Sequence, residues 1–243
     1  MHPALFDGPQ WHGCIFGEGW RKTDEALQVF EKATGRLLGV VGLAKEGDVE
    51  RAAGEASRVQ PDWAGTAPDE RAAVLRRAAG LLERHADEIV AWNVRETGGL
   101  RAKAGMELRS ATSALYAAAG MLSEPQGVVL PSRDGRLSYA RRVPHGIVGV
   151  IAPFNFPLTL SMRAVAPALA TGNAVIVKPD PHTPISGGVL LARIFEDAGL
   201  PGGLLHVLPG GADVGEALCR HPSVGMVAFT GSTAVGRRVG ALC

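Results

Sequence analysis

The second half of the chain alternates short apolar runs with helical patterns, and this alternation most limits what the chain can fold into. The runs are HGIVGVIAP, NAVIVKP, LLHVLPG and GMVAFTG, and each is followed by a stretch with helical periodicity. Strands that are almost wholly apolar are typical of a parallel sheet covered by helices on both faces. We therefore expect an α/β fold with a Rossmann-like parallel sheet and flanking helices. A ligand of such a sheet lies at the carboxyl ends of the strands.

The first half of the chain predicts a different set of elements. Residues 1–45 are expected to be irregular at first and then to form two strands around the Thr34-Gly35 turn. From residue 48 to about residue 97 the apolar spacing is helical, and we expect Pro61 and Pro68 to divide this stretch into at least two helices.

A hairpin is predicted within residues 126–143, where Asp134-Gly135 separates two strand-like runs. It lies between a helix expected at about 102–123 and the first apolar strand of the sheet. The hairpin can be an arm that pairs outside the main sheet, or a plain surface hairpin. The residues by themselves do not decide between the two.

The composition excludes several classes of function. The formal net charge is +1, which gives no electrostatic reason to expect nucleic acid or an anionic membrane as a partner. The three cysteines are widely spaced and form no CxxC pair, which argues against a disulfide framework or a zinc site and favours a reducing compartment. No secretory leader and no membrane span are recognisable, so we expect a cytoplasmic protein.

The first apolar strand ends in Ala152-Pro153-Phe154-Asn155-Phe156-Pro157. An asparagine between two aromatic residues and two prolines suits neither a helix interior nor a strand. It fits a rigid turn that holds one amide in place, where its N–H could stabilise a developing oxyanion. Alternatively, Asn155 caps the helix that follows.

The second and fourth strands also end in polar residues. Lys178 leaves an apolar strand at the ligand edge and could contact a ribose or a phosphate, or it could be a solvated strand end. After Phe229 and Thr230, Gly231 would let a phosphate approach the backbone. Ser232 would lie at a helix N-terminus, which favours anions. Ser232 could equally be a simple N-cap.

Taken in order, PFNFP, ALATGNAVIVKP and FTGS resemble the aldehyde dehydrogenase superfamily. The resemblance runs from the N-terminal strands to the last residue. The stretch SMRAVAPALATGNAVIVKPDP is most similar to the benzaldehyde and vanillin dehydrogenase branch. It implies NAD(P)-dependent oxidation of an aldehyde, with a small aromatic aldehyde as the substrate.

The resemblance also implies roles for individual residues. Asn155 matches the asparagine of the oxyanion hole, and Lys178 matches the lysine that binds the adenosine ribose. The hairpin matches part of the oligomerisation arm of homo-oligomeric family members. The positions that match the cofactor site are Ile151, Ala152, Pro153, Phe154, Lys178, Pro181, Gly211, Gly215, Phe229, Thr230, Gly231, Ser232 and Val235.

Two departures from the family pattern affect these expectations. Pro181 stands where many NAD-selective members have a glutamate that binds the ribose hydroxyls and repels a 2′-phosphate, so we expect NADP to be tolerated beside NAD. The nucleophilic cysteine and the glutamate base of the family are expected beyond residue 243, and Cys14, Cys219 and Cys243 do not match the nucleophile.

We therefore expect a truncated aldehyde dehydrogenase, inactive by itself. Residues 1–125 and 144–243 would form the NAD(P)-binding domain and 126–143 the oligomerisation hairpin, with the catalytic domain absent. The alternative is a non-catalytic dinucleotide-binding or interaction module, or the product of a disrupted gene.

Overall fold

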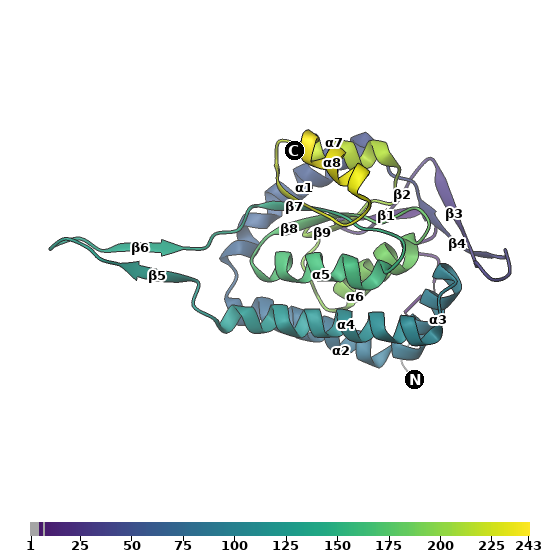
Figure 1. Ribbon diagram of the computed structural model, residues 1–243, viewed down its shortest axis with the longest axis horizontal. Helices are drawn as coiled ribbons and strands as arrows, with labels where there is room; N and C mark the ends of the chain where they lie inside the picture. Colours follow the sequence, from purple (N-terminus) through teal and green to yellow (C-terminus); the bar gives the residue numbers. More distant parts are fainter. Residues whose placement is uncertain (1–4, 7) are drawn as a thin grey trace.

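A central mixed sheet organises the protein, as seen in the computed structural model, which describes residues 5–6 and 8–243. Its strand order is β10-β7-β8-β9-β1-β2 (Figure 1). The first four of these strands are parallel to one another, which confirms the parallel sheet expected from the apolar runs. Their bounds are β7 Ile147–Ile151, β8 Ala174–Lys178, β9 Leu205–Val207 and β10 Val224–Phe229.

Two short strands near the N-terminus extend this sheet, which the sequence did not predict. They are β1 Cys14–Phe16 and β2 Trp20–Lys22. Phe16 of β1 pairs with Val207 of β9 in antiparallel orientation. Three apolar residues are too short a run to indicate a strand, so the expectation of an irregular segment was wrong here. The sheet is mixed rather than purely parallel.

Helices cover both faces of the sheet (Figure 1). On one face lie α1 Glu46–Gly65, α7 Ala212–Arg220 and α8 Thr233–Leu242. On the other face lie α5 Pro157–Ala170, the π-helical turn η2 Ile185–Val189 and α6 Leu190–Asp197. A further layer packs outside α5 and α6, made of α2 Pro68–Arg84, α3 Ala86–Thr97, α4 Arg101–Gly120 and the 3₁₀ turn η1 Met121–Ser123.

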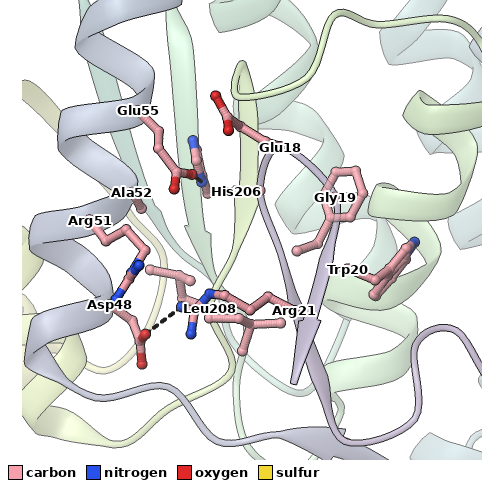
Figure 2. A pocket seen from close by; sticks show the side chains of 13 residues that line it. Glu18, Gly19, Trp20, Arg21, Asp48, Arg51, Ala52, Glu55, His206 and Leu208 are labelled. Atoms are coloured by element: carbon pink, nitrogen blue, oxygen red, sulfur yellow. Dashed lines mark hydrogen bonds and ion pairs between the residues drawn. The ribbon is translucent and has the colours of Figure 1, made fainter. Parts of the chain in front are cut away.

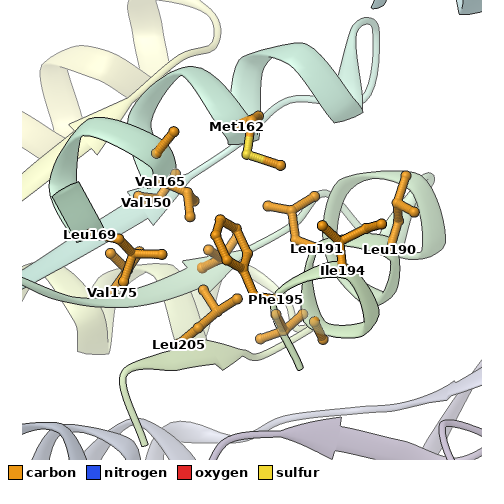
Figure 3. Close-up of a cluster of buried hydrophobic side chains, with 14 of the residues drawn as sticks. Val150, Met162, Val165, Leu169, Val175, Leu190, Leu191, Ile194, Phe195 and Leu205 are labelled. Carbon is orange, nitrogen blue, oxygen red and sulfur yellow. The ribbon is translucent and has the colours of Figure 1, made fainter. Parts of the chain in front are cut away.

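The core between the sheet and the α5–α6 layer is dense and apolar. Phe195 and Leu169 are fully buried and face Val150 and Val175 of the strands (Figure 3). Burying such side chains stabilises a fold by about 2 kcal/mol each. The strands β7, β8 and β9 are buried along their whole length, whereas the residues of β10 at the sheet edge are half-buried or exposed.

Both predicted hairpins are present. β3 Ala26–Phe30 pairs with β4 Leu37–Gly42 around Gly35, whose φ of 72° lies in the left-handed region that favours glycine. β5 Gly127–Leu130 pairs with β6 Ser138–Arg141 in a separate two-stranded sheet that extends far from the body (Figure 1). This hairpin therefore lies outside the main sheet, and its two strands pair with each other.

Pro68 separates two helices as expected, but Pro61 does not end a helix. It lies inside α1, exposed to solvent. On either side of it, the Gln60 amide donates to the Gly172 carbonyl at 2.7 Å, and the Trp63 indole N–H donates to the Leu169 carbonyl at 2.8 Å. These two contacts hold the helix through the position where the proline removes a backbone donor.

Candidate active site

The carboxyl ends of the parallel strands are joined by backbone hydrogen bonds. The amide of Ala152 donates to the carbonyl of Lys178 at 3.2 Å, and the amide of Thr230 donates to the carbonyl of Ile151 at 3.1 Å. The structure thus brings the residues predicted after β7, β8 and β10 to one edge. This is the edge at which ligands of open α/β sheets bind.

Lys178 is not a solvated strand end. Its side chain is only 8% exposed, and its ammonium donates to the carbonyls of Gly210 at 3.0 Å and Pro179 at 3.3 Å. Burial lowers the pKa of Lys178, and the carboxylates of Asp180 and Asp213 oppose this shift. An ammonium has three donors, so one remains for a ligand hydroxyl.

Asn155 does not cap the helix that follows. The N-cap of α5 is Phe156, and the Asn155 Oδ1 accepts the Phe156 backbone N–H at 3.1 Å. Because a backbone N–H must face an oxygen, this contact fixes which end of the Asn155 amide is the carbonyl oxygen and which is the NH₂ group. Asn155 is exposed to solvent.

The β7 end beside Asn155 changes from buried to exposed. Ile151 and Ala152 are buried, Pro153 is half-buried, and Phe154 is 57% exposed. The Phe154 ring lies 5.8 Å from the ring of His182, in the segment after β8. The two loops expected to hold the two halves of a dinucleotide therefore contact each other.

The segment after β8 carries Pro181, which is half-buried. Its neighbours are polar: the His182 ring nitrogen Nδ1 lies 2.7 Å from an Asp180 oxygen. Pro181 itself offers neither a hydroxyl acceptor nor a charge at this position.

Two of the glycines predicted for the cofactor site lie in or next to α7. Gly211 is the N-cap of α7. A Cβ on Gly215 would lie 3.5 Å from the Lys178 side chain and 3.8 Å from that of Ile151. Gly215 therefore faces the same edge as Lys178, and its lack of a side chain keeps that surface open.

The turn from β10 into α8 is the most exposed part of the edge. Phe229 and Thr230 are half-buried, whereas Gly231, Ser232 and Val235 are exposed. A Cβ on Gly231 would come within 2.5 Å of the Phe229 ring, so only glycine lets this ring fold over the turn. Ser232 is the N-cap of α8, with its hydroxyl accepting the Val235 N–H at 3.4 Å. The capping alternative is thus confirmed, and it leaves the other N–H groups of the first turn open to an anion.

Sequence reasoning missed two buried glutamates behind this edge. Glu107 accepts the backbone N–H of Leu158 at 3.1 Å, and Glu96 accepts those of Ile185 at 2.7 Å and Ser186 at 2.6 Å. Both glutamates lie within helices, where the surrounding sequence gives no sign of these contacts. Only the packing of α4 against α5 and of α3 against η2 reveals them.

A separate cavity of about 220 Å³ lies between α1 and the β1–β2 turn (Figure 2). Arg21 and Asp48 pair across it at 2.5 Å, and the buried His206 lies 3.8 Å from Glu55. It contains none of the predicted site residues. A second hollow, of about 470 Å³, lies between α5 and the β10 edge and borders the site at Phe229 and Thr230.

The described cysteines differ in environment. Cys14 and Cys219 are buried, and Cys243 is exposed at the end of α8. Burial raises the pKa of Cys14, and burial with the neighbouring Cys243 raises the pKa of Cys219 to about 11. A thiol with a raised pKa carries little thiolate at neutral pH and is a poor nucleophile.

Within the described residues, no cluster of three metal-binding side chains occurs. In the same part of the chain, no helix combines the length and apolar character needed to cross a membrane.

Known proteins share this sequence and fold. The chain is 53% identical to a vanillin dehydrogenase of Amycolatopsis sp. over 98% of its length, and 48% identical to a benzaldehyde dehydrogenase [NAD(+)] of Pseudomonas putida over 97%. It covers 49% of each of these proteins. The crystal structure of a NAD-dependent benzaldehyde dehydrogenase from Corynebacterium glutamicum matches 94% of the chain with a TM-score of 0.89 and 40% identity, over 51% of that protein.

The chain thus spans about half the length of these relatives. Its residues 20–243 match the aldehyde dehydrogenase family. The match includes every residue that the motifs placed at the carboxyl edge of the sheet. The chain belongs to the aldehyde dehydrogenase family.

Proposed function

We propose that this chain is the dinucleotide-binding part of an NAD(P)-dependent dehydrogenase that oxidises small aromatic aldehydes to carboxylic acids. The observation that carries the proposal is the joined edge of β7, β8 and β10, at which a buried lysine and an oriented asparagine amide both lie. The substrate class rests on the similarity to vanillin and benzaldehyde dehydrogenases.

The residues at this edge fit a dinucleotide. Lys178 has one N–H donor left for a ribose hydroxyl, and the open N–H groups at the start of α8 suit a pyrophosphate. Ile151, Ala152, Pro153 and Phe154 offer an apolar wall for a nicotinamide, and Gly211 and Gly215 leave room for an adenine. When bound, NAD(P) supplies the hydride acceptor of the reaction.

Asn155 would stabilise the oxyanion that forms when a nucleophile adds to the aldehyde carbonyl. A fixed side-chain N–H aimed at such an oxygen lowers the barrier by about 3 kcal/mol. The hydrogen bond of Asn155 to Phe156 supports this role because it aligns the amide before the substrate arrives.

We infer that the chain by itself binds cofactor without turning over aldehyde. Cys14 and Cys219 are buried thiols with raised pKa values, and Cys243 lies on α8 rather than at the β7 end. The buried thiols also fit a reducing, cytoplasmic environment.

Calorimetric titration of the chain with NAD and NADP, with benzaldehyde turnover measured in the same sample, tests this proposal. Binding without turnover would support it. Turnover near the family's usual rate would contradict the inactivity, and absence of any binding would favour an interaction module or a disrupted gene product.

We further propose that the site accepts NADP as well as NAD, because Pro181 places no carboxylate beside the ribose. The Pro181→Glu variant should then bind NADP about tenfold more weakly with little change for NAD, since two negative charges would meet. NADP binding far weaker than NAD in the unmodified chain would contradict the proposal.

We propose that the β5–β6 arm binds a second copy of the chain. Its apolar side chains are exposed, Val129 and Leu137 by 74% each and Tyr139 by 61%. A two-stranded hairpin is marginal in isolation and gains stability from a partner. Sedimentation of Val129→Asp and Leu137→Asp should show smaller species than the unmodified chain, and equal sizes would contradict the proposal.

A further inference from the structure

Two glutamates that no mechanism uses lie behind the predicted edge, each facing the start of a helix. Glu107 of α4 and Glu96 of α3 are fully buried, with 0% exposure. Burying a carboxylate costs several kcal/mol unless charged or N–H groups surround it. We therefore ask what the two buried carboxylates do for the proposed ligand edge in front of them.

Glu107 holds the turn that carries Asn155. Helix α5 begins with Phe156 as N-cap and Pro157 as its first residue, and neither side chain can accept a backbone N–H. The Oε2 atom of Glu107 takes over this role, accepting the N–H of Leu158 at 3.1 Å and of Thr159 at 3.4 Å.

The second oxygen of the same carboxylate extends the contact to the other side of the turn. Glu107 Oε1 accepts the Lys103 ammonium at 2.6 Å, and that ammonium lies 4.7 Å from the centre of the Phe156 ring. Phe156 is the residue whose N–H orients the Asn155 amide. Glu107 therefore fixes both the helix start and the aromatic neighbour of Asn155.

Glu96 holds the segment that follows Lys178. The turn η2 begins after Pro184, whose side chain offers no acceptor. Glu96 Oε1 accepts the Ile185 N–H at 2.7 Å, and Oε2 accepts the Ser186 N–H at 2.6 Å. Residues 179–184 are thus held between Lys178 and this carboxylate.

We propose that Glu107 and Glu96 are positioning residues, Glu107 for the Asn155 amide and Glu96 for the ribose-side segment after Lys178. An ordinary N-cap would stand at Phe156, within Pro-Phe-Asn-Phe-Pro, and at Pro184, at the end of the segment that follows Lys178. Because Glu107 and Glu96 accept these N–H groups from neighbouring helices, the residues of the two turns remain free to contact a ligand. The inference rests on the proposed function, because Asn155 and Lys178 have ligand roles only there.

The test compares Glu107→Leu and Glu96→Leu in the ¹⁵N-labelled chain, with Glu107→Gln and Glu96→Gln as conservative variants that keep one acceptor oxygen. Glu88→Gln is the matched control, since Glu88 also accepts two backbone N–H groups, those of Leu5 and Phe6, but belongs to neither turn. The readouts are the Asn155 side-chain amide resonances, backbone hydrogen exchange, and AMP affinity.

Glu107→Leu should shift the Asn155 amide resonances and speed exchange at Leu158 and Thr159, with AMP affinity nearly unchanged. Glu96→Leu should lower AMP affinity about fivefold and speed exchange at Ser186, without moving Asn155. The Gln variants should show the same changes at a much smaller size, because they keep one acceptor oxygen. If a Leu variant does not fold, its Gln variant should show the same local change at smaller size.

An unmoved Asn155 resonance in both Glu107 variants would overturn the role of Glu107. An AMP affinity no lower in the Glu96 variants than in Glu88→Gln would overturn that of Glu96. If the unmodified chain binds neither AMP nor NAD, the proposed function fails, and the Asn155 resonances still decide the role of Glu107.

Discussion

The Lys178 end and the α8 end of the proposed ligand edge differ in burial. Every residue of β8, including Lys178, is buried, and the Lys178 ammonium is held by two carbonyls. No residue of α8 is buried, and its Ser232 cap is exposed. One sheet edge therefore combines a part that is buried in the core with a part that packs only partly on its neighbours, through residues such as Val239 and the ion pair of Arg238 with Glu216. We expect substitutions in the core beneath the Lys178 end to reduce stability more than substitutions on α8 do.

The largest expected difference concerns stability. Phe195→Ala beneath β8 should lower the free energy of unfolding by about 4 kcal/mol, because it leaves a cavity in the core of Figure 3. Val235→Ala on α8 should change it by less than about 0.5 kcal/mol. Urea unfolding measures both. Similar losses would show that the two ends do not differ in packing.

The pH dependence of stability should also come from the buried side. Burial raises the pKa of Glu96 to about 7, although hydrogen bonds from Ser186 and Ile185 act to lower it. Burial lowers the pKa of His206 to about 4. Folded Glu96 holds its proton more tightly than the unfolded chain does, so its contribution falls as pH rises from about 4.5 to 7. Folded His206 resists protonation, so its contribution falls as pH drops from about 6.5 to 4.

Each effect is on the order of 3 kcal/mol, and in the unmodified chain the two slopes oppose each other between about pH 4.5 and 6.5. Glu96→Gln should make stability rise more steeply with pH, and His206→Asn should make it fall. Unfolding across this pH range measures the slopes. Arg238→Gln on α8 is the control and should leave the profile parallel. Parallel profiles for all three would contradict the prediction.

Lys178→Met separates binding from stability. Removing a charge-assisted hydrogen bond should weaken NAD binding about tenfold or more, while removing a buried ammonium should raise stability by about 1 kcal/mol. Calorimetry and thermal unfolding check the two signs. Lys45→Met, at an exposed ion pair with Glu25, should change neither quantity by much. An unchanged NAD affinity in Lys178→Met would show that Lys178 does not bind the cofactor.

A smaller effect than in the core is expected at Ser232. Ser232→Ala should cost α8 about 1 kcal/mol through loss of the cap. Ser232→Asp keeps the cap but brings a negative charge to the proposed pyrophosphate position, so NAD affinity should fall more in this variant than in Ser232→Ala. The reverse order of affinities would show that α8 contributes only as a capped helix.

Much of the fold could be predicted because its signals are local. Apolar runs located β7 to β10, and turn residues located both hairpins, since strand period and left-handed backbone depend on neighbouring residues. β1 and β2 could not be predicted, because short strands form only when β9 offers a free edge. Pro61 likewise stays within α1 because Gln60 and Trp63 bind residues more than a hundred positions away.

For the site, the sequence by itself determined which residues follow each strand and therefore that Ile151, Lys178 and Thr230 share one edge. Only the tertiary structure decided that Lys178 is buried and that Asn155 does not cap α5. It alone placed Glu96 and Glu107 behind the two turns. The physical reason is that the hydrogen bonds of buried groups are satisfied across the fold, by partners that no local pattern identifies.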